Sequence, residues 1–184
     1  MRWYVVAALS VLVGLSACAP EKPDPKKDRG HADKKDPPPP CHPGCFPAGT
    51  PVATPEGPRP IEAVGRGDRV VVVAADGTTT AARVGSTFQT CNRLVEVRTD
   101  QGRLLTTTTQ PLCLVSGEFR PAGELTEGDR VWRWQGDRRQ EARVVAVVPT
   151  GQEAEVFNLV IGESAVFVAG GFLARGKPPL PDAE

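Results

Sequence analysis

Side chains able to do acid–base or nucleophilic chemistry are few in this 184-residue chain, and they are unevenly placed. Both histidines, His31 and His42, lie near the N-terminus, so residues 45–176 contain no imidazole. Five of the six lysines lie within residues 22–35, and the sixth is Lys177. A Ser-His-Asp triad, an H-E-x-x-H zinc site, a P-loop lysine and a Schiff-base lysine are therefore excluded from the region that can fold.

Cysteine thiols are the nucleophiles that remain. The five cysteines are Cys18, Cys41, Cys45, Cys91 and Cys113. The C-H-P-G-C run of residues 41–45 offers three metal ligands with no fourth in reach, and it lacks the C-x-x-C spacing of redox motifs. We therefore expect no metal and no cofactor, which leaves Cys45 either as a nucleophile or as half of a disulfide.

The charge balance limits the partners of the chain. Its 22 basic and 22 acidic side chains cancel, so no basic surplus is present to bind nucleic acid or anionic lipid headgroups. We expect no nucleic-acid partner, and the sequence identifies no protein partner.

The N-terminus has the pattern of an export signal. Arg2 precedes an apolar stretch over residues 3–17 that is too short to span a bilayer, which is typical of a signal peptide. The stretch ends in L-S-A-C at residues 15–18, which resembles the lipobox of bacterial lipoproteins; a plain secretory signal is the alternative. The resemblance implies lipid attachment at Cys18 and anchoring in the bacterial cell envelope, and Ala19 after it suggests the outer membrane, facing the periplasm or the surface.

Composition divides the rest of the chain into three parts. Residues 18–40 are rich in proline, lysine and aspartate and cannot bury enough apolar surface to fold, which predicts a disordered tether. Residues 41–176 form one domain, and residues 177–184 form a disordered tail.

The domain is predicted to be all-β, because valine, threonine and glycine are frequent and no window shows a helical apolar period. Hairpin turns are expected at the D-G and Q-G pairs that begin at residues 76, 101 and 135. The expected strands are Arg69–Ala74, Thr78–Phe88, Arg93–Thr99, Arg103–Thr109, Leu112–Val115, Arg130–Trp134, Arg139–Val148, Glu155–Val160 and Ala165–Ala169.

The domain also contains an internal repeat. The run VGRGDRV at residues 64–70 returns as LTEGDRV at residues 125–131, an offset of 61. The triplet ARV recurs at residues 82–84 and 142–144, close to the same offset. These matches predict two similar β subdomains.

The segment CFPAGTPVATPEGPRPIEAVGRGDRV, residues 45–70, closely resembles the opening block of Hint domains, the autoprocessing modules of hedgehog proteins and inteins. The resemblance continues through residues 102–111, 119–125, 156–160 and 166–174. It implies a horseshoe of two β subdomains related by a pseudo-two-fold axis.

In active Hint domains the first residue attacks the preceding carbonyl and turns a peptide bond into a thioester. The resemblance places the nucleophile at Cys45 and the scissile bond between Gly44 and Cys45. Thr107 matches the threonine of the T-x-x-H motif, which grips the scissile amide together with its histidine. Gln110 stands in place of that histidine and has no proton to give up near neutral pH, so we expect slow or absent thioester formation.

Two further positions depart from the family. Asn158 falls where active members often carry aspartate. Residues 175–177 read R-G-K where splicing inteins have histidine, asparagine and a nucleophile, so splicing is excluded. No sterol-recruiting extension is recognised, and sterol transfer is not supported.

An oxidising compartment makes disulfides expected among Cys41, Cys45, Cys91 and Cys113, which allow three pairings. A hairpin that turns at residues 101–102 would place Cys91 within one residue of Cys113, and we predict that bond. We also hypothesise a Cys41–Cys45 bond that caps the nucleophile until it is reduced.

Two functions follow. The first is single-turnover autoprocessing, in which Cys45 performs an N–S acyl shift that can cleave the Gly44–Cys45 bond. The second is a decayed Hint scaffold that serves as a membrane-tethered binding or structural module.

Overall fold

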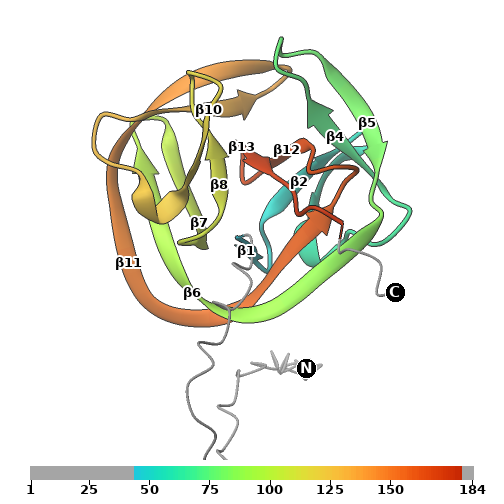
Figure 1. Cartoon of the computed structure of the whole chain (residues 1–184), viewed down its shortest axis with the longest axis horizontal. Helices are drawn as coiled ribbons and strands as arrows, with labels where there is room; N and C mark the ends of the chain where they lie inside the picture. The colour runs from blue at the N-terminus through green and yellow to red at the C-terminus, as the bar shows by residue number, and fades with distance from the viewer. Residues whose placement is uncertain (1–43, 180–184) are drawn as a thin grey trace, which may run out of the picture.

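The computed structural model describes residues 44–179, and these residues form an all-β fold with two short 3-10 turns (Figure 1). The predicted fold class is confirmed. The strands are β1 (Phe46–Pro47), β2 (Pro51–Thr54), β3 (Gly57–Pro60), β4 (Arg69–Val73), β5 (Thr79–Arg83), β6 (Ser86–Thr99), β7 (Gly102–Thr107), β8 (Pro111–Cys113), β9 (Phe119–Pro121), β10 (Arg130–Gln135), β11 (Arg138–Val160), β12 (Val166–Ala169) and β13 (Phe172–Arg175). The 3-10 turns are η1 (Ile61–Ala63) and η2 (Ala122–Glu124).

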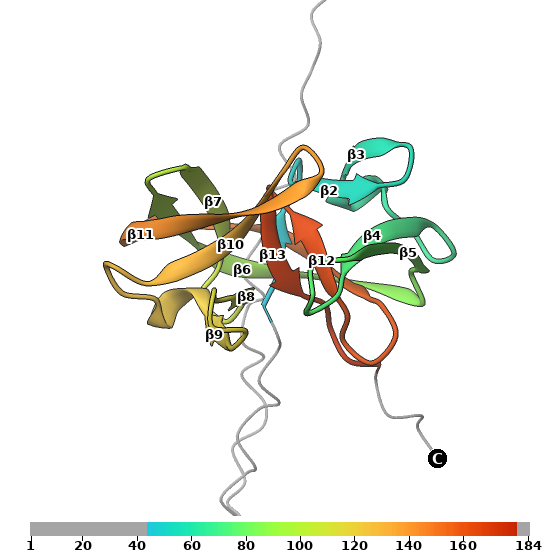
Figure 2. The same cartoon turned by 90° about the horizontal axis from the view of Figure 1, so that it is seen from above.

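Two long strands, β6 and β11, form the frame of the molecule. They pair antiparallel and curve around the shorter strands, as Figures 1 and 2 show. The pairing is irregular between Pro149 and Glu153, where Gly151 adopts a φ of 70° that favours glycine. The sequence predicted two separate strands here, Arg139–Val148 and Glu155–Val160, one on either side of this irregularity. The structure instead keeps one continuous strand and bends it.

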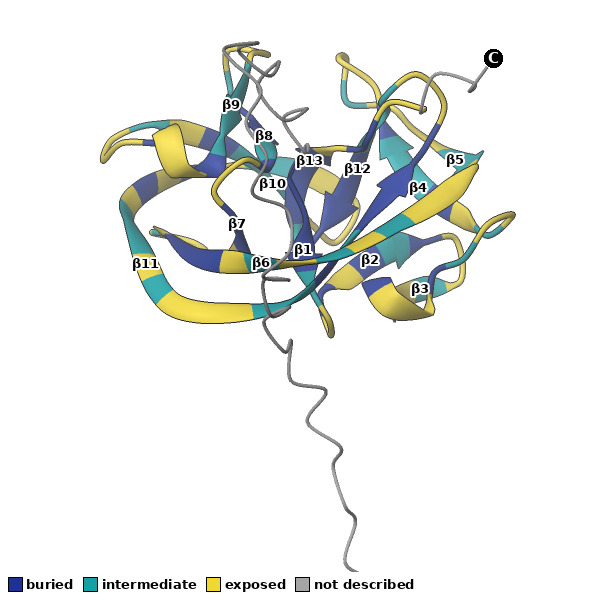
Figure 3. Cartoon of the chain, turned by 60° about the horizontal axis from the view of Figure 1, so that its bottom comes forward, coloured by how far each residue is buried: buried dark blue, intermediate teal, exposed yellow. Residues whose placement is uncertain are grey.

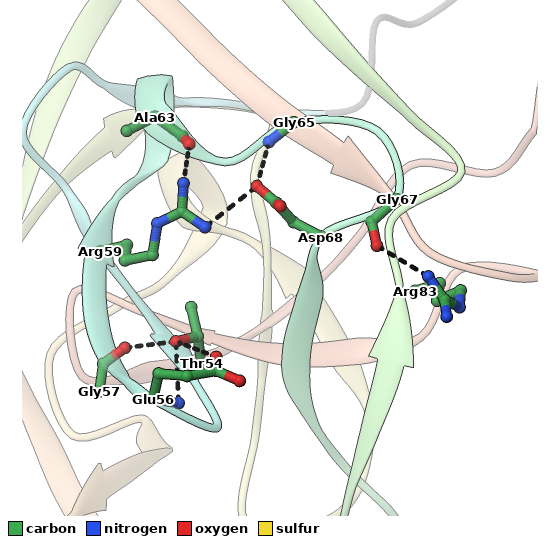
Figure 4. A network of polar contacts seen from close by, with 9 residues as sticks. All are labelled: Thr54, Glu56, Gly57, Arg59, Ala63, Gly65, Gly67, Asp68 and Arg83. Atoms are coloured by element: carbon green, nitrogen blue, oxygen red, sulfur yellow. Dashed lines mark hydrogen bonds and ion pairs between the residues drawn. The ribbon is translucent and has the colours of Figure 1, made fainter.

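The internal repeat is confirmed as a repeated turn. In the first copy, shown in Figure 4, Asp68 accepts from the Gly65 N–H at 2.9 Å and pairs with Arg59 at 3.1 Å. In the second copy Asp129 accepts from the Thr126 N–H at 2.7 Å and pairs with Arg120 at 2.7 Å. These hydrogen bonds lower the pKa of both aspartates, the backbone N–H of Gly65 or Thr126 contributing most. Each G-D pair therefore ends its turn in the same way, and a β-hairpin follows it.

The core lies between the curved frame and the central strands. Figure 3 shows buried residues on β12 and β13 and exposed residues along the bend of β11. Phe46, directly after the predicted nucleophile, is fully buried and meets the Phe167 ring edge-on at 6.1 Å. β1 also pairs with β11 through Phe46 and Phe157. The start of the domain is therefore fixed by both packing and backbone pairing.

Five strands, β1, β2, β3, β9 and β13, were not predicted, because they are short and most of them contain proline. Within residues 44–179 no helix has the length and hydrophobicity needed to cross a bilayer.

Candidate functional site

The backbone of Cys45 is held against the threonine-rich strand β7. Its amide N–H donates to the Thr107 hydroxyl oxygen at 2.8 Å. Its carbonyl oxygen accepts from the Thr106 hydroxyl at 2.8 Å and from the Thr107 N–H at 3.0 Å. Both threonines are fully buried. The structure thus brings together Cys45 and Thr107, which the sequence placed 62 residues apart.

The Cys45 side chain is 2% exposed and packs with Leu94 and Val156. Burial raises the pKa of the thiol to about 11, and the positive charge of Lys177 opposes this rise. The thiol is therefore protonated at neutral pH, and it needs a proton acceptor before it can attack a carbonyl.

The Gly44 carbonyl, which precedes the predicted nucleophile, has a hydrogen-bond donor. The Asn158 side-chain nitrogen Nδ2 donates to the Gly44 carbonyl oxygen and, at 3.2 Å, to Oε1 of Gln110. Its other atom, Oδ1, accepts from the Leu159 N–H at 2.7 Å, which fixes the orientation of the amide. An amide at this position places a partial positive charge where the tetrahedral oxyanion would form.

Among the described residues, the Gln110 side chain, which the resemblance places at the histidine position of the motif, contacts Asn158 and two backbone carbonyl oxygens rather than the Cys45 amide. Its Nε2 donates to the carbonyl oxygens of Pro111 at 3.1 Å and Arg175 at 3.0 Å. Its Oε1 accepts from Asn158. Gln110 therefore positions Asn158 and ties the end of β13 to the site.

Gly44 lies too close to the backbone of Gln110 to carry a side chain. A Cβ atom at Gly44 would fall 1.9 Å from the Gln110 Cα and 2.0 Å from its nitrogen. The Gly44 N–H donates to the Thr109 carbonyl oxygen at 3.3 Å. The resemblance placed Gly44 before the predicted scissile bond, and the structure adds that no residue with a side chain fits there.

The predicted Cys91–Cys113 bond is wrong. Cys113 is not disulfide-bonded and packs with Val73, Val168 and Leu173. The β6–β7 hairpin ends at the pair Leu94–Thr107, so it does not extend to these cysteines, and Cys91 pairs instead with Glu155 of β11. Cys91 is disulfide-bonded, with neither Cys45 nor Cys113 as its partner.

The hypothesised Cys41–Cys45 bond is also wrong, because Cys45 is not disulfide-bonded and its side chain is buried inside the domain. Cys18, Cys41, His31 and His42 lie outside the described residues.

Sequence reasoning missed Lys177, which it assigned to a terminal tail. The side chain is only 5% exposed, and its backbone N–H donates to the Leu159 carbonyl oxygen at 2.9 Å. Proline and charge dominate residues 177–184, so composition alone gave no sign that the first of them is buried.

A hollow of about 420 Å³ lies elsewhere, between Cys113, Trp132 and Arg139. None of the residues around Cys45 lines it. The side chains that contact the Gly44–Cys45 peptide group therefore surround the polypeptide backbone, and none of them lines this hollow.

Comparison with known proteins agrees with the fold described above. Residues 44–101 match the family described as Hint domain. No curated protein matches the chain. Among solved structures, a variant of the Ssp DnaB mini-intein is 15% identical, covers 75% of this chain and 97% of its own, and has a TM-score of 0.68.

Two further structures have the same architecture. A DnaB intein from Synechocystis sp. PCC 6803 is 15% identical over 73% of this chain and 99% of its own, with a TM-score of 0.65. A bacterial intein-like domain from Clostridium thermocellum is 19% identical over 72% of this chain and 98% of its own, with a TM-score of 0.60. At these identities the matches establish the fold.

Proposed function

We propose that this chain, which carries a Hint domain, is a self-processing protein in which the Cys45 thiol attacks the Gly44 carbonyl. In this step a bond forms between Cys45 Sγ and the Gly44 carbonyl carbon, and the peptide bond to the Cys45 nitrogen breaks. The thiol proton ends on that nitrogen, so the step is an isomerisation that needs no co-reactant.

The observation that carries this proposal is the pair of contacts on the scissile peptide group. Asn158 donates to its carbonyl oxygen and Thr107 accepts from its N–H, so both ends of the group are held by buried side chains. A buried carbonyl needs a hydrogen-bond partner in any fold, but here the partner is a side-chain amide that Gln110 and the Leu159 N–H hold in one orientation. Such a donor stabilises a tetrahedral oxyanion, typically by a factor of about 10² to 10³ in rate.

Water or a small thiol then resolves the thioester. Hydrolysis leaves a carboxylate on Gly44 and a new N-terminal Cys45, which ends the reaction after one turnover. Splicing is excluded because residues 175–177 lack the asparagine that would cyclise and cut the downstream bond.

The location follows from the first eighteen residues. We propose export, lipidation of Cys18 and anchoring in the bacterial envelope, so that cleavage after Gly44 separates the β domain from its lipid anchor.

We further propose that Cys91 pairs with Cys41. Cys45 and Cys113 are not disulfide-bonded, and lipidation would occupy Cys18, which leaves Cys41. Such a bond would keep the cleaved leader on the domain until it is reduced.

A second candidate, a decayed scaffold kept for binding, is favoured by one observation: the Cys45 thiol is buried and has a raised pKa, with no histidine in residues 45–176 to remove its proton. The two candidates differ in what the purified full-length protein does. Self-processing predicts a fragment beginning at Cys45 whose yield rises with hydroxylamine or thiol and is abolished in Cys45→Ala. An intact chain over days under reducing conditions would support the scaffold.

A further inference from the structure

The last described residues run alongside the site. The Arg175 carbonyl oxygen accepts from Gln110, and two residues later Lys177 pairs with β11 in a parallel bridge to Val160. The Lys177 N–H donates to the Leu159 carbonyl oxygen at 2.9 Å, directly after Asn158. Lys177 is thereby fixed to the same part of β11 that supplies the donor to the scissile carbonyl.

The Lys177 side chain points into the domain rather than into solvent. Its Nζ lies 3.6 Å from the centroid of the Phe88 ring, over the face of that ring. Phe88 in turn packs against the cluster of Cys45, Leu94 and Val156. None of the ion pairs among residues 44–179 includes Lys177. A lysine that is 95% covered without a carboxylate is costly to keep charged, which makes a structural role a poor explanation.

Among residues 44–179, β6 places the uncharged Phe88 ring against this amine. The Leu159 carbonyl oxygen of β11 contacts the backbone N–H of Lys177 and not its amine. Cys45 is the titratable side chain that acts on Lys177 among the described residues. Burial lowers the pKa of Lys177, and the Cys45 thiolate opposes this. The interaction is mutual, because the Lys177 charge lowers the pKa of the thiol.

We propose that Lys177 is the proton carrier of the acyl shift and supplies, from the other end of the domain, the function that the missing histidine would have had. This inference rests on the proposed function. The neutral amine takes the proton from Cys45 Sγ as sulfur attacks the Gly44 carbonyl carbon. The resulting ammonium gives a proton to the Cys45 nitrogen as the peptide bond breaks. Lys177 ends neutral, so one proton has moved from sulfur to nitrogen and no charge is left over.

The first test measures the thiol itself and does not require cleavage. The pH dependence of Cys45 methylthiolation by methyl methanethiosulfonate is followed by peptide mapping in the full-length protein, which separates Cys45 from Cys113. In Lys177→Met no amine can take up the thiol proton and stabilise the thiolate as an ammonium, and we expect Cys45 modification at pH 8 to slow about tenfold, since an opposite charge nearby shifts a pKa by about one unit or more. Lys177→Arg keeps a cation beside the thiol at every accessible pH, so Cys45 is modified at least as fast as in the wild type.

The second test uses the same variants in cleavage. Arginine cannot give up its proton at accessible pH, so Lys177→Arg separates charge from proton transfer. We expect both variants to lose about a hundredfold in the rate of hydroxylamine-dependent cleavage, the usual size of an acid–base contribution. A rate in Lys177→Arg equal to the wild type would overturn the proton-carrier role.

Two controls keep the outcomes separable. Circular dichroism and thermal unfolding check the fold, and Phe88→Leu, which keeps Lys177 but removes the ring that holds it, should slow methylthiolation in the same direction. If Lys177→Met leaves the Cys45 profile unchanged, the inference fails whatever the cleavage data are. If the wild type never cleaves but the profile shifts, the proposed function fails and the Cys45–Lys177 pair stands as a relic of it.

Discussion

Asn158 donates a hydrogen bond from its side-chain amide to the carbonyl oxygen of Gly44, 114 residues away in the sequence. The asparagine is fully buried, and its other hydrogen bonds to Gln110 and the Leu159 N–H leave it one orientation. The domain therefore supplies a rigid donor to the bond that precedes its first residue.

Replacing Asn158 by alanine removes that donor. We expect Asn158→Ala to lower the rate of hydroxylamine-dependent cleavage by about 10² to 10³, the range found when one oxyanion donor is lost. The rate is measured by intact mass at fixed pH. Asn92→Ala is the matched control, because Asn92 also lies in the β6–β11 ladder, but within residues 44–179 its side chain accepts a hydrogen bond only from the N–H of its neighbour Arg93, at 2.8 Å. Equal losses in both variants would show a general effect on the ladder and remove Asn158 from the mechanism.

Gly44 should tolerate no side chain. In Gly44→Ala the new Cβ would overlap the backbone of Gln110, so the scissile group has to move away from Asn158 and Thr107. We expect slower cleavage and a lower unfolding temperature. Gly65→Ala serves as the control, since a Cβ there meets nothing nearer than 4.0 Å. Wild-type behaviour of Gly44→Ala would mean that the described contact between residues 44 and 110 is not formed in solution.

Gln110→His restores the motif histidine. An imidazole can give and accept a proton near neutral pH, which a carboxamide cannot. We expect cleavage to accelerate about tenfold to a hundredfold. The variant loses the hydrogen bond to the Arg175 carbonyl oxygen, so thermal unfolding is measured beside the rate. A folded Gln110→His that cleaves no faster than wild type would show that an imidazole at residue 110 adds nothing to the acyl shift, and it would remove this position from the mechanism.

Stability at high pH reports on the buried thiol. Burial raises the pKa of Cys45 to about 11 from 9.0. Between these values the unfolded chain loses the thiol proton while the folded protein keeps it, so the folded state binds more protons and stability falls as pH rises. We expect the urea midpoint to fall more steeply from pH 9 to 11 in the wild type than in Cys45→Ala. Lys177, whose pKa is lowered, acts in the opposite sense, and it is present in both proteins. If the urea midpoint depended on pH in the same way in both proteins, the Cys45 thiol would be exposed to solvent in the folded state.

Reductant should control release of the leader. If Cys41 pairs with Cys91, cleavage after Gly44 leaves both fragments joined, and non-reducing mass spectrometry detects a single species one water heavier than the intact chain. Dithiothreitol then separates them. In Cys91→Ser we expect separation without reductant. Immediate separation of the wild-type fragments under non-reducing conditions would contradict this pairing.

Much of the fold was predictable because its signals are local. Asp68 and Asp129 each accept a hydrogen bond from a backbone N–H three residues earlier, so a short sequence match was enough to find both turns. The continuity of β11 through Gly151 could not be predicted, because the bend there depends on pairing with β6.

The residues of the site also fall into those that the sequence could predict and those that it could not. Cys45, Thr107 and Asn158 occupy positions that the family pattern identifies, and the structure brings them together. The roles of Gln110 and Lys177 depend on contacts across 65 and more residues, which no local pattern encodes. The wrong Cys91–Cys113 pairing has the same origin, since it extended the β6–β7 hairpin beyond the point where the chain turns away.

Trapping the carbonyl of Gly44 tests the central proposal most directly. The purified full-length protein is incubated with hydroxylamine under reducing conditions, and the N-terminal fragment is sequenced by tandem mass spectrometry. A thioester between Gly44 and Cys45 predicts a fragment that ends in the hydroxamate of Gly44, with none formed in Cys45→Ala. An unmodified intact chain, or a hydroxamate on any other residue, would contradict the acyl shift at Cys45.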